Sequence, residues 1–142
     1  MIIANPKGLS IRPEEAELIA SIETLSGLER AKLERFRLTS AYRPKDAYGF
    51  HREGLAVDVA CDVLPLMLEL YEALKAAKWP GGLGLAGPGV PLHIHADARQ
   101  RKSYPPAYFY ELKDGQKFFY PSQQVTAGAY AKYTPMVQRC YR

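Results

Sequence analysis

The three histidines of this chain all lie in two short acidic motifs, which hold the side chains best suited to chemistry. His51 begins "HREGLAVD", a motif that ends at Asp58, and His93 and His95 stand together in "PLHIHADAR". On one helix, this spacing would separate His51 from Asp58 by about 10 Å, whereas the ligand atoms of one zinc ion approach each other to roughly 3–3.5 Å. The two side chains can therefore share a metal only if the chain folds back between them, and Gly54 permits such a turn.

The second motif has the alternation of a strand, in which every second side chain lies on the same face. One face would carry His93, His95, Asp97 and Arg99, and the other would carry the apolar Leu92, Ile94, Ala96 and Ala98. His51, Asp58 and one histidine of the pair then predict a three-ligand zinc site. Its fourth position would stay open for water, as is typical of a catalytic zinc. Chance proximity of these residues is the alternative interpretation.

The elements that must position these motifs follow from the apolar patterns of the chain. Helices are predicted over 13–25, with a face of Ala16, Ile19, Ala20 and Ile22, and over 63–79, with a face of Leu66, Leu70, Leu74 and Ala77. A short helix or turn is expected over 28–36, and strands over 37–43, 55–61 and 91–98. A Gly/Pro loop over 80–89 could include a short strand, and a hairpin is expected near 115–121. These elements predict an α+β fold with a small, largely antiparallel sheet and flanking helices.

Length and composition indicate how many domains the chain forms and whether it could span a membrane. With 142 residues, 47% hydrophobic and 24% charged, the chain is expected to form one globular domain, residues 1–142, and to be a monomer. No apolar run approaches the roughly 18 residues of a membrane span. The first residues do not look like a signal peptide. We therefore expect a protein that stays where it is made, is exported by another route, or has lost a leader.

Net charge and cysteine content limit the macromolecular partners and the metal ligands that this chain is expected to have. A net charge of +4 mildly favours an anionic partner such as a cell wall, although a solvated basic surface explains it equally well. Nucleic acid is not an expected partner, because no basic helix or aromatic-basic motif appears. Cys61 and Cys140 form no C-x-x-C pair, which argues against thiolate metal ligands. Two buried thiols are favoured over one disulfide.

Four ordered motifs resemble those of the zinc D-Ala-D-Ala carboxypeptidases and murein endopeptidases, a group that also includes lysostaphin-type peptidases and the hedgehog signalling domain. The motifs are "SAYRP" (40–44), "HREGLAVDV" (51–59), "GGLG" (81–84) and "HIHADAR" (93–99). The resemblance covers about residues 15–100, and 101–142 would be an aromatic-rich extension packed on this core. It implies a zinc peptidase with one Zn²⁺ per chain. The substrate would be peptidoglycan stem peptides or cross-links, cut by a D,D-carboxypeptidase or an endolysin-like endopeptidase.

The resemblance also implies roles for individual residues. His51, Asp58 and His95 would bind the zinc, and His93 would act as general base or stabilise the tetrahedral intermediate. Arg43 would hold a substrate carboxylate or the developing oxyanion.

Two further residues would support these roles. Ser40 would contact substrate or support its loop, and Asp97 would orient a ligand histidine through the second ring nitrogen of that histidine. Arg99 would pair with Asp97 or with a substrate carboxylate.

Leu92 departs from the pattern, since some branches place an acidic base three positions before the last ligand histidine. His93 could take that role, or another carboxylate such as Glu53 could. The remaining alternative is a non-catalytic zinc-binding interaction or structural module with the same fold. Phe50 also differs, because many members have a small polar residue there, and Trp79 is expected to pack in the core.

Overall fold

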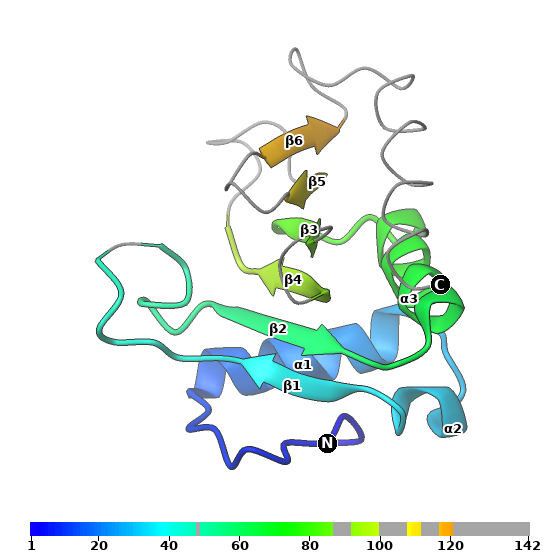
Figure 1. Cartoon of the computed structure of the whole chain (residues 1–142), viewed down its shortest axis with the longest axis horizontal. Helices are drawn as coiled ribbons and strands as arrows, with labels where there is room; N and C mark the ends of the chain where they lie inside the picture. The colour runs from blue at the N-terminus through cyan, green and yellow to red at the C-terminus, as the bar shows by residue number, and fades with distance from the viewer. Residues whose placement is uncertain (48, 87–91, 100–107, 112–116, 121–142) are drawn as a thin grey trace.

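The computed structural model describes residues 1–47, 49–86, 92–99 and the strands 108–111 and 117–120. These parts of the chain form one sheet of six strands in the order β1-β2-β4-β3-β5-β6 (Figure 1). The elements are α1 (Pro13–Leu25), α2 (Arg30–Leu33), β1 (Arg37–Ser40), β2 (Ala56–Ala60), α3 (Leu64–Ala76), β3 (Leu83–Ala86), β4 (His93–Asp97), β5 (Tyr108–Glu111) and β6 (Lys117–Tyr120). β1, β2, β4 and β3 pair antiparallel, while β5 lies parallel to β3 and antiparallel to β6. The predicted α+β fold with a largely antiparallel sheet is confirmed.

The C-terminal third is described only where it forms strands. The hairpin expected near 115–121 contributes β6, which pairs with β5. The rest of the extension 101–142, including Cys140, lies outside the described residues, as does the end of the predicted loop 80–89. The interpretation of 101–142 as an extension packed on the core therefore stays a prediction.

Helix α1 begins at Pro13 because a proline at the first position removes no helical hydrogen bond. Glu15 reaches back to the helix start, where its Oε1 accepts a hydrogen bond from the Arg12 backbone N–H at 2.9 Å. The buried face consists of Glu15, Leu18, Ile19 and Ile22. The predicted face was therefore only partly right, since Ala16 and Ala20 are exposed. The larger Leu18, which the pattern left out, occupies the core in their place.

Helix α3 buries Leu66, Leu70 and Leu74, as its pattern predicts. It ends at Ala76, three residues before the predicted end, and Ala77 is exposed. The chain turns there because Lys78 adopts a left-handed φ of 58°. The following Trp79 N–H then donates to the Leu74 carbonyl at 3.0 Å.

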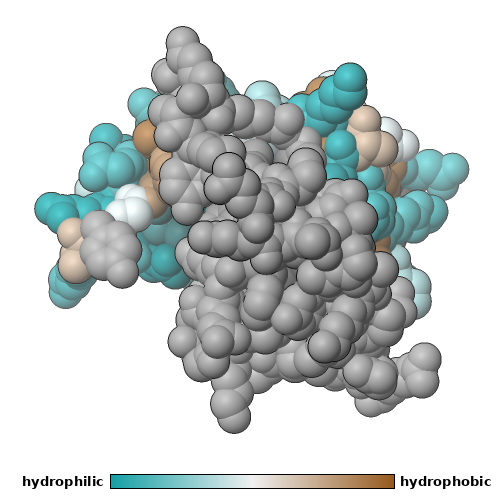
Figure 2. All heavy atoms as spheres, turned by 90° about the horizontal axis from the view of Figure 1, so that it is seen from above, coloured by the Kyte–Doolittle hydropathy of each residue, from teal (hydrophilic) through white to brown (hydrophobic). Residues whose placement is uncertain are grey.

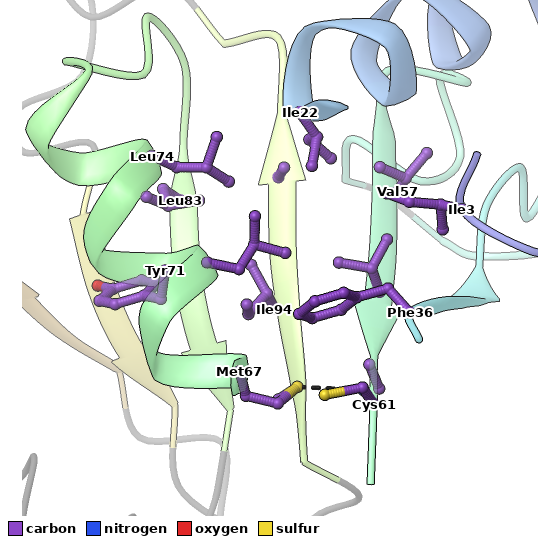
Figure 3. Close-up of a cluster of buried hydrophobic side chains, with 14 of the residues drawn as sticks. Ile3, Ile22, Phe36, Val57, Cys61, Met67, Tyr71, Leu74, Leu83 and Ile94 are labelled. Atoms are coloured by element: carbon purple, nitrogen blue, oxygen red, sulfur yellow. Dashed lines mark hydrogen bonds between the residues drawn. The ribbon is translucent and has the colours of Figure 1, made fainter. Parts of the chain in front are cut away.

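The hydrophobic core lies between one face of the sheet and the helices α1 and α3. Figure 3 shows side chains from both layers meeting there; they include Ile22, Phe36, Val57, Met67, Tyr71, Leu74, Leu83 and Ile94. Cys61 is a buried free cysteine at the edge of this core, and its backbone N–H donates to the Met67 sulfur at 3.3 Å. The described residues visible in Figure 2 are mostly hydrophilic. No helix of the described residues is long and apolar enough to cross a membrane.

Strand alternation leaves the opposite face of the sheet to polar side chains. Val57 in β2 and Ile94 in β4 lie in the core, so Asp58, His93 and His95 lie on the other face. Asp58 and His95 are direct partners in the β2–β4 pairing. The sheet thus brings one carboxylate and one imidazole side by side with no contribution from loops.

A tight turn brings the third residue to this face. The chain leaves β1 and returns to β2 through the segment 41–55, where Gly54 adopts a left-handed φ of 71°. The Gly54 N–H donates to the His51 carbonyl at 3.3 Å, and the Arg43 N–H donates to the same oxygen at 2.9 Å. The turn predicted at Gly54 is confirmed, and it is the reason why His51 can lie beside Asp58.

Gly54→Ala should lower the free energy of unfolding by more than the roughly 1–2 kcal/mol that a left-handed backbone costs a residue with a Cβ. The added methyl would lie 2.9 Å from Cγ of Arg12, so that side chain must also move. Gly27→Ala is the matched control, because Gly27 has a similar φ of 65° and nothing within 4 Å of the added methyl. Urea denaturation of both variants measures the difference, and equal losses would show that the Arg12 contact is unimportant.

Candidate metal centre

His51, Asp58 and His95 come together on the polar face of the sheet. Each offers one ligand atom, and these atoms lie within 4.8 Å of one another. Asp58 Oδ1 is 3.1 Å from Nε2 of His51 and 3.1 Å from Nδ1 of His95. His51 and Asp58 are buried, and His95 is half-buried. This group could bind a metal ion, and its two nitrogens and one oxygen match a three-ligand set.

The second nitrogen of each ring is already engaged with an oxygen. His51 Nδ1 lies 2.8 Å from the Ala41 carbonyl oxygen, and His95 Nε2 lies 2.8 Å from Asp97 Oδ2. A carbonyl or an ionised carboxylate can only accept, so both of these ring nitrogens must donate. In the neutral rings, the lone pairs then lie on Nε2 of His51 and Nδ1 of His95, and both face Asp58. Three lone-pair atoms that converge in this way require a cation between them, either a metal ion or ring protons.

The Asp97 carboxylate that binds His95 also accepts hydrogen bonds from two other residues. Asp97 is 0% exposed. Its Oδ1 accepts from the backbone N–H groups of Gly82 at 2.8 Å and Arg99 at 3.0 Å, and the Arg99 guanidinium donates to Oδ2 at 2.8 Å. A Cβ on Gly82 would lie 2.4 Å from Oδ2, so only glycine fits there. The "GGLG" turn therefore leaves the space that this carboxylate occupies.

The backbone of Asp97 is anchored as firmly as its side chain. The Asp97 N–H donates to the Gly82 carbonyl at 2.9 Å, and the Trp79 indole N–H donates to the Asp97 carbonyl at 3.2 Å. Trp79 is buried, as predicted, and it also contributes this hydrogen bond. Gly81 lies so close to the Asp97 carbonyl that an added Cβ would overlap it.

Opposing effects set the protonation of the cluster in the metal-free protein. Burial lowers the pKa of His95, but hydrogen bonds to Asp58 and Asp97 outweigh it and raise the pKa to about 9. Burial raises the pKa of Asp58, yet the hydrogen bonds from His51 and His95 hold it well below its usual range. The pKa of Asp97 is likewise raised by burial but lowered further by His95 and Arg99. Both carboxylates therefore stay ionised and favour positive charge between them.

His93 lies at the edge of the group and is not part of the three-residue set. Its Nε2 is 3.8 Å from Asp58 Oδ2, beyond hydrogen-bond distance, and its side chain is 22% exposed. It shares the polar face with His95, two residues along β4. Solvent can therefore reach an imidazole directly beside this three-residue group.

Arg43 and Ser40 lie next to each other at the end of β1. The Arg43 guanidinium donates to Ser40 Oγ at 3.1 Å and to Asp46 Oδ2 at 2.8 Å. Ser40 is the pairing partner of Asp58 across β1 and β2. The structure thus places both residues near the group, but with the guanidinium engaged by Asp46, a residue that the sequence analysis did not single out.

The structure also places the remaining residues that the sequence singled out, and none of them belongs to the three-residue group. Leu92 is half-buried and packs against the core, and Glu53 is exposed in the turn. Ala98 was expected on the apolar face but is exposed, because β4 ends at Asp97. Arg99, likewise beyond the strand end, bends back onto Asp97.

Comparisons of the chain with protein-family models, with curated proteins and with solved structures found no match.

Asp97→Asn should weaken zinc binding by about 10- to 100-fold, because an amide cannot hold His95 Nε2–H as a carboxylate does. Asp62→Asn is the matched control, since Asp62 is 88% exposed and pairs with Arg37 away from the cluster. Competition with a chelator measures the dissociation constant of both variants, with circular dichroism as the test of folding. Equal affinities for the folded Asp97→Asn variant and the wild type would rule out this positioning role.

The stability of the metal-free protein and the stabilisation that zinc adds to it should change with pH in opposite ways. The pKa of His95 is about 9 in the folded metal-free protein, above the ordinary value of 6.5, so the folded state binds more protons between these values. This contribution to stability is complete below about pH 6.5 and is lost as the pH rises through 9. Zinc needs the neutral ring, so its affinity should rise over the same interval.

Thermal unfolding from pH 6.5 to 8.5 checks both trends. The Tm of the metal-free protein should fall, while the increase in Tm caused by a fixed excess of zinc should grow. His95→Gln should flatten both curves. Parallel curves with and without zinc in the wild type would contradict the predicted competition between protons and metal.

Proposed function

We propose that this protein is a zinc-dependent peptidase that hydrolyses amide bonds in peptidoglycan stem peptides or cross-links. The observation that carries the proposal is the convergence of His51, Asp58 and His95, with the second nitrogen of each ring already engaged by an oxygen. The ordered motifs that resemble the zinc D-Ala-D-Ala carboxypeptidases and murein endopeptidases supply the reaction and the substrate class.

Zinc suits the donor set better than the other common ions. Two imidazole nitrogens and one carboxylate oxygen match catalytic zinc sites, which keep the fourth position for water or substrate. Calcium and magnesium prefer oxygen ligands alone. We therefore assign one zinc ion per chain to this group.

The surrounding side chains would then divide the reaction among them. His51, Asp58 and His95 would hold the zinc ion, which would supply an activated water and polarise the scissile carbonyl. His93 accepts the proton that leaves the attacking water and returns it to the leaving amine, since it is solvent-accessible and adjacent to the ligands. Arg43 exchanges Asp46 for a substrate carboxylate or for the oxyanion, because the Arg43–Asp46 pair lies near the surface, where ion pairs are weak.

The basic charge of the chain supports an anionic wall polymer as the substrate. We propose a monomer that meets the wall after export or after delivery by a phage. Neither a nucleic acid nor a membrane enters this proposal.

A zinc-binding module without turnover is the second candidate. The observation that favours it is Leu92, an apolar residue packed against the core where some branches carry an acidic base. The two candidates differ in whether His93 transfers protons. They agree on the metal ligands, so only an activity measurement separates them.

Purified muropeptides incubated with the zinc-loaded protein should give an amide cleavage product by mass spectrometry, and EDTA should abolish it. His93→Gln should lower kcat by about 100- to 10,000-fold and keep the full zinc content. His51→Ala should lose the zinc and the activity together. Asp62→Asn should leave both unchanged. A wild-type protein that binds zinc but cleaves no stem peptide would favour the non-catalytic module.

A further inference from the structure

The two candidate histidine ligands come from different parts of the chain, and contacts outside the cluster join these parts. His51 stands in the turn between β1 and β2, and His95 stands in β4. Phe50, next to His51, places its ring 4.7 Å from the guanidinium carbon of Arg99, just beyond the end of β4. This distance is within the range of a cation–π interaction.

The Arg99 guanidinium makes two kinds of contact at once. Its Nε and Nη2 donate to the carboxylate of Asp97 at 3.0 Å and 2.8 Å, while the Phe50 ring lies within reach of the same group. The Arg99 side chain is only 9% exposed. Such burial strengthens both contacts, because water competes less for the guanidinium.

A continuous chain of contacts therefore runs behind the ligands. Phe50 adjoins His51, Arg99 joins Phe50 to Asp97, and Asp97 holds Nε2 of His95. Backbone hydrogen bonds link the same two segments. The Ala98 N–H donates to the Leu55 carbonyl at 3.0 Å, and the Leu55 N–H donates to the Phe50 carbonyl at 2.9 Å. The turn and the end of β4 are thus fastened to each other at the level of the site.

We propose that Phe50 and Arg99 form a clamp that positions His51 and His95 relative to each other and so strengthens metal binding and slows metal release. The proposal rests on the metal site of the proposed function, but it does not depend on peptide hydrolysis. Phe50 and Arg99 act through the segments that carry the ligands, so they are positioning residues.

The clamp requires the particular chemistry of its two members. Lysine at position 99 would keep the charge but lose the planar fork that binds a carboxylate through two N–H groups and stacks on a ring. Leucine at position 50 would keep an apolar side chain but lose the π-face, whereas tyrosine would keep the ring. These substitutions separate the contact from charge and burial.

The test is a double-mutant cycle on zinc binding with Phe50→Leu, Arg99→Lys and the double variant. Dissociation constants come from competition with a chelator, and release rates come from transfer of zinc to an excess of chelator. Phe50→Leu should weaken binding by about 3- to 10-fold, which is the range expected for one cation–π contact, and Phe50→Tyr should stay within about 2-fold of the wild type. The double variant should match Arg99→Lys alone, because the contact is already lost there. Arg30→Lys, at an exposed Arg30–Glu34 pair, is the control and should change nothing.

The visible spectrum of bound Co²⁺ gives a second readout that general stability does not move. It should shift in Phe50→Leu and Arg99→Lys but not in Arg30→Lys. Multiplicative losses in the double variant, or wild-type affinity and release in Phe50→Leu, would overturn the clamp. If Phe50→Leu fails to fold, Arg99→Lys is compared with the wild type and with Phe50→Tyr instead. An unchanged release rate and cobalt spectrum in Arg99→Lys would also overturn the clamp. Failure to cleave muropeptides would sink the peptidase proposal and leave these measurements unaffected.

Discussion

The buried carboxylate of Asp97 is the constraint on which the rest of the site depends. Removing a charge from water costs several kcal/mol unless the structure supplies partners, and Asp97 is 0% exposed. Its partners come from the glycine turn before β3, from Arg99 beyond β4 and from His95 within β4. Each of these segments must therefore be in place before the carboxylate can be buried. In return, the carboxylate fixes which nitrogen of His95 can bind a metal.

The sheet separates this polar construction from the hydrophobic core by strand alternation alone. Val57 and Ile94 pack against the helices, while Asp58 and His95 meet on the other face through the pairing of β2 with β4. A slip of one residue in either strand would move the ligands into the core. The packing of α1 and α3 thus protects the site, because it makes any other strand register costly.

The strand faces and the turn of the site were predictable from the sequence because local patterns encode them. The ends of elements and the tertiary contacts were not. Period-two alternation placed His93 and His95 on one face, and Gly54 marked the turn because few other residues adopt a left-handed φ. The ends of elements were less accessible, since Ala77 and Ala98 continue their patterns beyond the points where the chain leaves the helix and the strand. The contacts of Phe50 with Arg99 and of Arg43 with Asp46 join segments by tertiary packing. No local pattern encodes such contacts. For Gly82 the only signal was its place in "GGLG", which marks a turn but not the carboxylate that fills it.

The charge and the geometry of the cluster explain why it suits a cation. Asp58 and Asp97 contribute two negative charges, and Arg99 balances one of them. With both rings neutral, the group therefore carries one net negative charge, which a bound cation offsets. With their outer nitrogens committed to Ala41 and Asp97, the two rings direct their lone pairs toward Asp58, where a cation can lie between them. A proton on His95 and a metal ion therefore compete for the same site, and the pH decides which of them the ring binds.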